Sequence, residues 1–315
     1  MTNEYHKPVM LSESIDGLSL RPEGTYVDAT FGGGGHSRAI LERLGSDGRL
    51  VAFDQDEDAA KRVEAGEWKV ESEATFTFIH ENFRYLKNYL RLYGVRRVDG
   101  ILADLGVSSH QFDVAERGFS TRYDGALDLR MDRRNDVTGA DLVNSLGEEE
   151  LARLLKLYGE LPNAHQMARA IVKWRAERGI ETTTDLKEAV SHHLPRGMEN
   201  KYLAMLFQAL RIEVNGELEA LKELLQQAVE VLPAGGRLVV ISYHSLEDRL
   251  VKNFMKSGNF DGEVKKDFYG NVLSPLKMVS RGAIKASEEE VMSNSRARSA
   301  RLRVAERIDI NIVNQ

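Results

Sequence analysis

The chain has no cysteine among its 315 residues. This absence excludes a cysteine nucleophile, a disulfide and a cysteine-ligated iron–sulfur cluster, and it fits a reducing compartment. Long apolar segments are missing too: residues 1–7 carry no run of the signal-peptide type, and no stretch of about eighteen apolar residues follows. We therefore expect a soluble cytoplasmic protein with no membrane partner.

An excess of positive charge is also lacking. The net charge is −6 and the isoelectric point is about 5.8, so any nucleic acid must be held by local basic patches. Hydrophobic residues make up 42% of the sequence, which is ample for a packed core. The length is typical of about two domains.

Glycine is concentrated at one place. A short β-prone run covers residues 26–31, four consecutive glycines follow from Gly32 to Gly35, and an apolar pattern with helical spacing begins at Ala39. This order predicts a strand that turns tightly into a helix, where a ligand can approach the backbone closely. A plain turn without a ligand is the alternative, but four adjacent glycines would make it entropically costly.

These glycines do not match the dinucleotide fingerprint, which requires glycine at relative positions one, three and six. Counted from Gly32, the sixth position is Ser37, and counted from Thr30 the first glycine is missing. The spacing therefore disfavours a bound pyrophosphate and, with it, a nicotinamide-dependent dehydrogenase.

Acidic residues follow two of the predicted strands. Residues 49–53 form one such strand, and it ends in Asp54. An acid at this place can accept hydrogen bonds from the ribose of an adenosine-containing cofactor, although alone it is equally an exposed acid in an acidic turn. Asp104 follows the strand 100–103, and the carboxyl ends of parallel strands are where open α/β sheets bind and react.

An aromatic and a histidine side chain follow two further strands. Phe83 comes after the predicted strand 76–80, where an adenine could rest on its ring or where the ring could belong to the core. His244 comes after the predicted strand 236–242, and both a proton-transfer role and a backbone-bonded loop histidine remain open.

More than a hundred residues separate Asp104 from the strand 236–242, whereas a crossover needs only a few dozen. An all-helical insert is therefore expected. Its helices, with one or two more that lead back to the sheet, are predicted over 148–158, 163–178, 184–193 and 201–232.

Local signals refine this picture. Capping boxes are predicted at Ser145…Glu148 and Ser245…Asp248. The basic residues of the second predicted helix could touch phosphates, but solvated side chains are the favoured interpretation. The clearest phosphate-contacting candidates are four arginines near the C-terminus: Arg296, Arg298, Arg301 and Arg303.

Eight short motifs occur in a highly specific joint order: His6–Val9, Gly33–Ser37, Asp104–Ser109, Glu116–Ser120, Leu127–Asp132, Phe207–Ile212, Tyr243–Arg249 and Asn294–Ser299. With them, nearly the whole chain resembles the ribosomal RNA small-subunit methyltransferase H family. The resemblance implies an α/β protein, namely a Rossmann-like S-adenosylmethionine-dependent methyltransferase core with an inserted all-helical domain. The implied parts are residues 1–108 of the core, the insert 109–211 for RNA recognition, and residues 212–315 of the core with a basic C-terminal segment.

The resemblance also implies an activity and its sites. The family transfers a methyl group from S-adenosyl-L-methionine to N4 of a cytidine in 16S rRNA, near the decoding site. Its partner is 16S rRNA in the small ribosomal subunit or an assembly intermediate, and a homodimer is left open. No metal is implied. The cofactor positions carry over onto Gly34, Gly35, His36, Asp54, Phe83, Asp104 and Gln111, of which Gln111 rests on the resemblance alone.

The chemistry of this reaction favours direct in-line transfer without a covalent enzyme intermediate. The cytosine amine is a weak nucleophile because its lone pair is delocalised, so catalysis consists mainly of positioning, with an acceptor for the amine N–H. Asp104 or a backbone carbonyl beside it is the expected acceptor. The lack of cysteine excludes thiol attack on the ring, and the base must be unstacked or flipped. A non-catalytic RNA-binding assembly factor is the rival from another class.

Overall fold

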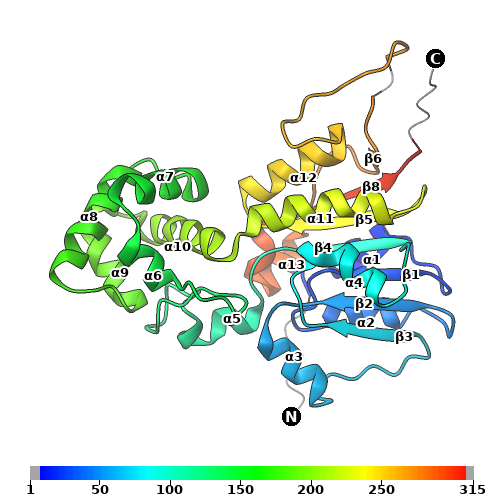
Figure 1. The fold of residues 1–315 in the computed structure, drawn as a ribbon, viewed down its shortest axis with the longest axis horizontal. Coiled ribbons are helices and arrows are strands. Elements are labelled where there is room, and N and C mark those ends of the chain that lie inside the picture. Colours follow the sequence, from blue (N-terminus) through cyan, green and yellow to red (C-terminus); the bar gives the residue numbers. More distant parts are fainter. Residues whose placement is uncertain (1–7, 271, 310–315) are drawn as a thin grey trace. The chain divides into compact units, whose positions relative to one another are not determined.

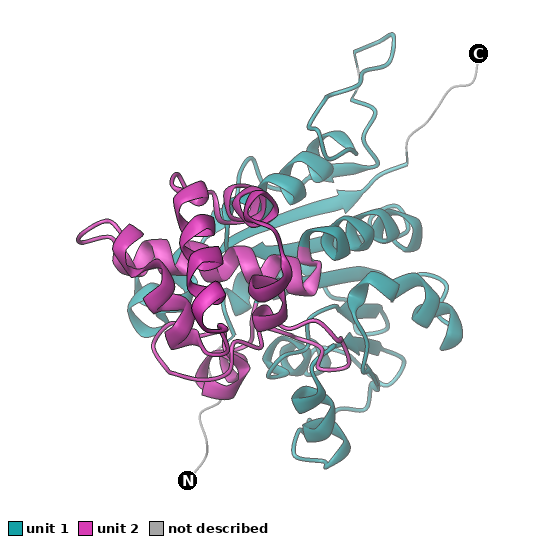
Figure 2. Ribbon diagram, turned by 60° about the vertical axis from the view of Figure 1, so that its left-hand side comes forward, with its two compact units in different colours: residues 1–106, 218–315 teal, residues 107–217 magenta. Residues whose placement is uncertain are grey.

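The computed structural model describes residues 8–270 and 272–309, so His6 and Lys7 of the first motif lie outside the described residues. The chain divides into two compact units, coloured separately in Figure 2. Unit 1 comprises residues 1–106 and 218–315, and unit 2 comprises residues 107–217. The changes between units thus fall at 106/107 and 217/218, where the sequence led us to expect 108/109 and 211/212.

Unit 1 is built on one sheet (Figure 1). Among the described residues the order is β3-β2-β1-β4-β5-β8-β6, with β7 paired to β8. The first five strands in chain order run parallel and the last pairings are antiparallel. The strands are β1 (Thr25–Asp28), β2 (Arg49–Phe53), β3 (Thr75–Ile79), β4 (Gly100–Asp104), β5 (Arg237–Ser242), β6 (Leu276–Met278), β7 (Ile284–Lys285) and β8 (Arg301–Arg307).

Helices cover both faces of this sheet, as the nearly continuous apolar runs of its parallel strands require. On one face Val27 and Ile101 pack against residues of α4 (Leu86–Leu92), α11 (Glu217–Val231) and α12 (Ser245–Ser257). On the other face Leu50 and Leu102 pack against α1 (Leu11–Leu18) and α2 (Gly35–Leu41). The other α-helices described in this unit are α3 (Glu57–Glu64) and α13 (Glu288–Ser293). The α/β fold class predicted from the sequence is confirmed.

Unit 2 is helical and has a hydrophobic core of its own. The helices predicted at 148–158 and 163–178 match α7 and α8 to within one residue at each end, and the long pattern from 201 is divided at Gly216. The helices are α5 (Ser109–Asp113), α6 (Gly139–Ser145), α7 (Glu148–Gly159), α8 (Ala164–Glu177), α9 (Thr183–Val190) and α10 (Glu199–Asn215). None of the helices among residues 8–270 and 272–309 has the length and apolarity needed to cross a membrane.

The predicted caps of two helices are wrong. α7 begins after Gly147, whose N–H donates to the Glu150 carboxylate at 3.0 Å, whereas Ser145 ends α6. Glycine and serine can both occupy an N-cap position, so the sequence alone does not decide which of the two residues caps the helix.

α12 is capped by an unexpected residue. Its N-cap is His244, whose ring Nδ1 accepts a hydrogen bond from the N–H of Glu247 at 3.4 Å. The predicted partner Asp248 instead accepts two hydrogen bonds from the Arg303 guanidinium, at 2.8 and 3.0 Å. Of the two roles left open for His244, the structure thus shows the backbone-bonded one.

The predicted phosphate-binding arginines separate into buried and exposed members. The side chain of Arg303 is only 9% exposed in its pair with Asp248, so it holds β8 against α12 and does not face solvent. Arg298 and Arg301 are exposed. On α8 and its C-cap, Arg169 pairs with Glu148 and Arg178 pairs with Asp185.

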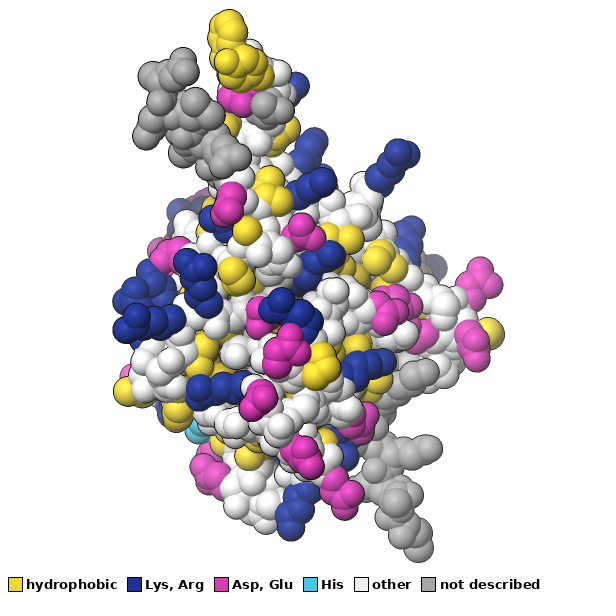
Figure 3. All heavy atoms as spheres, turned by 90° about the vertical axis from the view of Figure 1, so that its right-hand side faces the viewer, with side chains coloured by type: hydrophobic (Ala, Val, Ile, Leu, Met, Phe, Trp, Pro, Cys, Tyr) yellow, Lys and Arg dark blue, Asp and Glu magenta, His cyan; other side chains and the backbone are white. Residues whose placement is uncertain are grey.

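An arm between α12 and β6 projects from unit 1. Lys266 and Val272 form an antiparallel bridge in it, and near its end Phe268 is 97% exposed and Tyr269 83% exposed. Figure 3 shows hydrophobic side chains at the tip of the uppermost projection, with basic and acidic side chains interspersed over the face below it. The visible charge is thus mixed, in keeping with the acidic net charge of the chain.

Candidate active site

The strand order of unit 1 reverses direction between β1 and β4. In open α/β sheets, ligands bind outside the carboxyl ends of the strands at this switch point. Chain segments that continue from β1, β2, β4 and β5 carry the residues Gly34, Asp54, Asp104 and Tyr243 at this edge. We therefore take the edge formed by these strand ends as the candidate site.

The glycine segment forms a bent loop between β1 and α2. Gly32 has φ +52° and Gly34 has φ +77°, values that glycine adopts without the steric cost of a side chain. Asp28, fully buried at the end of β1, holds both sides of this loop: its Oδ1 accepts the Thr30 N–H at 3.1 Å and its Oδ2 accepts the Ser37 hydroxyl at 2.7 Å. The loop is therefore pre-formed by bonds to a buried carboxylate.

Two of the glycines are also required by close packing. A Cβ on Gly34 would lie 2.1 Å from Nε1 of Trp68, and a Cβ on Gly35 would lie 2.2 Å from Cγ of Pro8. Both distances are far below van der Waals contact. Trp68 in turn packs edge-on against Phe31 with ring centroids 4.9 Å apart. The back of the loop is thus a wall of aromatic and proline side chains.

Asp54 lies at the tip of β2 and faces this loop. Its Oδ2 accepts the Gly32 N–H at 2.6 Å, and its Oδ1 accepts the Asp56 N–H at 2.8 Å. Burial raises the pKa of Asp54 to about 7, with nearby Asp56 and Asp28 adding to the rise. A further hydrogen-bond donor, such as a ribose hydroxyl, would stabilise the ionised form of this carboxylate.

Asp104 ends β4 and is held from three directions. Its N–H donates to Oγ1 of Thr30 at 2.7 Å, and its Oδ1 accepts the Tyr243 hydroxyl at 2.7 Å. Its Oδ2 lies 3.8 Å from Nδ1 of His36. Burial raises the pKa of Asp104 to about 6, while His36 and the Tyr243 hydrogen bond act in the opposite direction.

His36, in the first turn of α2, is buried beside this carboxylate. Its Nε2 lies 3.1 Å from the carbonyl oxygen of Val9, to which it donates because a carbonyl only accepts. Nδ1 is thereby directed toward Asp104. The contact with Asp104 links α2 to the end of β4. The sequence did not predict this link.

Phe83 follows β3, and its half-buried ring packs against the core face that contains Val27 and Phe53. The loop before it is tied to the end of β2, because the Asn82 amide donates to the side-chain oxygen of Gln55 at 2.7 Å. The ring is therefore in part core, one of the two roles that the sequence left open.

Gln111 belongs to unit 2. It is buried in α5, where its side-chain oxygen accepts the Ser108 N–H at 2.9 Å and its own N–H donates to the Ser108 hydroxyl at 3.3 Å. These two bonds make a capping box. The other six predicted positions, Gly34, Gly35, His36, Asp54, Phe83 and Asp104, all lie in unit 1.

Three residues of the site were missed by the sequence reasoning: Asp28, Thr30 and Tyr243. Asp28 and Thr30 flank the end of β1, and their polar side chains in an otherwise buried segment were an available signal. Tyr243 follows β5 and reaches Asp104 on the neighbouring strand. Its role depends on strand order, which the local sequence does not reveal.

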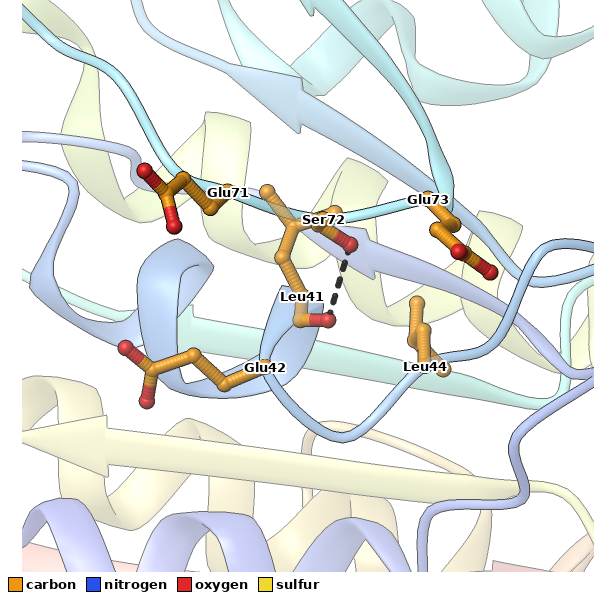
Figure 4. Close-up of a pocket in the computed structure, with 6 residues that line it drawn as sticks. All are labelled: Leu41, Glu42, Leu44, Glu71, Ser72 and Glu73. Carbon is orange, nitrogen blue, oxygen red and sulfur yellow. Dashed lines mark hydrogen bonds between the residues drawn. The ribbon is translucent and has the colours of Figure 1, made fainter.

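A hollow of about 460 Å³ lies elsewhere on unit 1 (Figure 4). It is lined at the C-terminal end of α2 by Leu41, Glu42 and Leu44 and, beside them, by Glu71, Ser72 and Glu73. The Ser72 hydroxyl donates to the Leu41 carbonyl at 3.0 Å across it. Of the predicted site residues, Gly34, Gly35 and His36 lie at the opposite, N-terminal end of α2.

Comparison with known proteins decides the family. The model of the MraW methylase family matches residues 3–308 of the chain. The chain belongs to this family. As an MraW methylase it is a methyltransferase, and S-adenosylmethionine is its cofactor, as the sequence predicted.

Relatives align with this MraW methylase from end to end. A protein from Flavobacterium johnsoniae named ribosomal RNA small subunit methyltransferase H is 54% identical over 307 residues, which are 98% of this chain and 99% of that protein. A protein of the same name from Cytophaga hutchinsonii is 57% identical over 303 residues, covering 96% and 99%. Among solved structures, an rRNA methylase from Streptococcus thermophilus aligns with a TM-score of 0.41 and 12% identity, covering 94% and 95%.

Proposed function

We propose that this MraW methylase transfers the methyl group of S-adenosylmethionine to the exocyclic N4 of one cytidine in 16S rRNA, near the decoding site. The relatives of the same length are named for small-subunit rRNA methylation. The lack of cysteine removes thiol-dependent attack at C5 of cytosine, so the amine is the simpler target on that base.

The observation that carries this proposal is the group of carboxylates around the glycine loop. Burial raises the pKa of Asp28, Asp54 and Asp104, and the charge of Asp28 raises the pKa of the other two further. Such a site favours a cation. S-adenosylmethionine carries a sulfonium and an ammonium group, whereas the pyrophosphate of a nicotinamide cofactor would be repelled.

The residues of the loop suit the rest of this cofactor. Gly34 and Gly35 present backbone without a side chain, and Asp54 retains free lone pairs for ribose hydroxyls beyond its two backbone bonds. Phe83 offers a half-buried ring edge to the adenine. Gln111 is assigned to the cofactor only by the family resemblance. When bound, the cofactor supplies a methyl group on positively charged sulfur, which is already an activated electrophile.

Asp104 is the residue that we assign to the amine. In the transfer, a bond would form between the methyl carbon and N4, the bond from sulfur to that carbon would break with its electron pair left on sulfur, and the proton released from N4 would pass to the Asp104 carboxylate. Above a pH of about 6 the Asp104 carboxylate is ionised and can accept a hydrogen bond from the N–H, which localises the lone pair on nitrogen. Positioning of the amine in line with the S–C bond supplies the remaining acceleration.

Recognition of the RNA is assigned to unit 2 and to the exposed arginines of the C-terminal segment. Arg298 and Arg301 are exposed beside β8, so they can neutralise phosphates. In unit 2, Arg117 of the Glu116–Ser120 motif is internal: it is fully buried and donates to the carbonyls of Arg130 and Met131. The Arg117 side chain therefore holds the segment of Arg130 and Met131 in place from within unit 2.

The decisive experiment is methyl transfer from labelled S-adenosylmethionine to small ribosomal subunits and their assembly intermediates, followed by nucleoside mass spectrometry. The expected product is N4-methylcytidine at one position of 16S rRNA. An Asp104→Ala variant should bind RNA normally and yield little product.

Failure has two distinct forms. RNA binding without product on any assembly state would support the rival, a binding factor that retains a cofactor fold. A different methylated nucleoside would keep the enzyme class and overturn the N4 assignment.

A further inference from the structure

The Asp104 carboxylate is held at its two oxygens by residues from two other elements. The Tyr243 hydroxyl donates to Oδ1 at 2.7 Å, and His36 Nδ1 lies 3.8 Å from Oδ2. A carboxylate with a bonded partner on one oxygen and a cationic or polar neighbour on the other has one preferred rotation about its Cβ–Cγ bond. The direction of its remaining lone pairs is thereby set before any ligand binds.

Tyr243 is itself fixed at its backbone. Its N–H donates to Oε2 of Glu247 at 2.9 Å, and Glu247 is only 2% exposed in the first turn of α12. Two residues earlier, the Ile241 carbonyl accepts the N–H of Leu105 at 3.0 Å, which keeps the ends of β5 and β4 side by side. The hydroxyl of Tyr243 therefore approaches Asp104 from a rigid platform.

We propose that Tyr243 is a positioning residue for methyl transfer: its hydroxyl bond turns the Asp104 carboxylate toward the reacting amine. The inference rests on the proposed function and extends it, because neither the motif spacing nor the family resemblance assigned Tyr243 a role. The hydroxyl acts through Asp104 and does not itself touch substrate.

The charged groups around Asp104 set the direction of the expected pH effect. His36 on α2 and the Tyr243 hydroxyl favour its ionised form, whereas Asp28 on β1 and Glu247 on α12 disfavour it, as burial does. Removal of the hydroxyl leaves the two opposing carboxylates in place. The ionised fraction of Asp104 at a given pH must therefore fall.

The test uses Tyr243→Phe in the full-length protein, with small ribosomal subunits and S-adenosylmethionine as substrates. The acid limb of the pH profile of kcat should move upward by about one pH unit. Above that limb kcat should fall about tenfold because the carboxylate has lost its orientation, with KM for the subunits unchanged. In an Asp104→Asn background the same substitution should have no further effect, because the carboxylate through which it acts is gone.

Tyr26→Phe is the matched control. Tyr26 is a fully buried tyrosine of β1 whose hydroxyl accepts the N–H of Arg21 at 2.7 Å, on the same sheet but away from the candidate site. It should lower stability without moving the acid limb. Thermal unfolding of both variants separates folding defects from catalytic ones.

Two results would overturn the inference. The first is an acid limb of Tyr243→Phe that coincides with the wild-type limb. The second is a loss of kcat that is equal in the presence and absence of the Asp104 carboxylate. Either shows that the hydroxyl does not act through Asp104. If the wild-type protein produces no N4-methylcytidine at all, the proposed function fails first, and the two failures are distinguished by that product.

Discussion

Glycine is required at position 34 both by the backbone conformation there and by the neighbouring side chains. Its positive φ would tolerate a few residue types, but Trp68 occupies the space that any Cβ would need. The sequence showed that four glycines were present and that Ser37 stands where the dinucleotide fingerprint requires its last glycine. It could not show that Trp68, 34 residues along the chain, closes the back of the loop.

Gly34→Ala should therefore abolish cofactor binding and destabilise the fold. Gly94→Ala is a matched control, because Gly94 has φ +72° and no atom within 4 Å of the Cβ position. Backbone strain should cost each variant about 1 kcal/mol, and overpacking against Trp68 should cost Gly34→Ala about 2 kcal/mol more. Urea unfolding and titration calorimetry measure both effects. Equal losses in the two variants would contradict the role of Trp68.

Asp54 is predicted to make stability depend on pH. Its pKa in the folded protein is about 7, above the ordinary value of 3.8. A carboxyl group whose pKa is raised by folding favours the folded state at low pH, and this contribution is lost as the pH rises from about 4 to about 7. Between these pH values the Asp54 carboxyl group is ionised in the unfolded chain but still protonated in the folded protein, so a rise in pH favours unfolding.

Asp54→Asn removes this titration. Between pH 5 and pH 8, the unfolding free energy of the cofactor-free variant should gain about 2 kcal/mol relative to wild type. Urea titrations of both proteins at the two pH values test this. The difference between variant and wild type at pH 8, minus the same difference at pH 5, cancels the constant cost of the lost hydrogen bond to Gly32 or Asp56. A difference that is independent of pH would refute the raised pKa. The variant should also bind S-adenosylmethionine more weakly.

At the scale of elements, strands and helices followed closely from local pattern, but the roles of charged side chains did not. The run from Arg296 to Arg303 looks uniform in sequence. Arg298 precedes β8 and is exposed, whereas Arg301 and Arg303 are two residues apart in β8, where the first is exposed and the second is buried. Arg303 points inward to Asp248 on α12. Arg117, part of the Glu116–Ser120 motif, is fully buried despite its charge.

Arg303→Ala and Arg298→Ala should therefore differ in kind. Arg303→Ala leaves Asp248 without its bidentate partner and should lower stability by about 2 kcal/mol, a figure reduced for the partial exposure of Asp248. Arg298→Ala should leave stability unchanged, weaken binding to small-subunit RNA several-fold, and reduce the salt slope of binding by about one. Thermal melts and RNA titrations at several salt concentrations test both variants. A loss of stability in Arg298→Ala together with a loss of RNA binding alone in Arg303→Ala would contradict these roles.

At the scale of the whole molecule, the helical unit has its own core. Its buried apolar residues come from α6 to α10 and from the loop before α6, and both its ends connect to the sheet unit. A segment with a closed core of this kind is expected to fold alone.

The fragment 107–217 should fold cooperatively when produced by itself. Far-ultraviolet circular dichroism should show a helical spectrum with a single thermal transition, and calorimetry should detect no binding of S-adenosylmethionine, because the glycine loop, Asp54 and Asp104 lie in the other unit. A fragment that melts without a transition would mean that the unit depends on the sheet for its stability.

The sequence by itself determined the five parallel strands, the helical insert, the loop and strand-end residues, and the family. Each of these follows from residues that are close together in the sequence, through apolar periodicity, glycine clusters and motif order. Only the tertiary structure decided which strand ends are neighbours, and hence that Asp28, Asp104, His36 and Tyr243 meet at one edge. The physical reason is that burial and charge coupling depend on distance in space, so the raised pKa values of Asp54 and Asp104 arise only once the sheet has assembled.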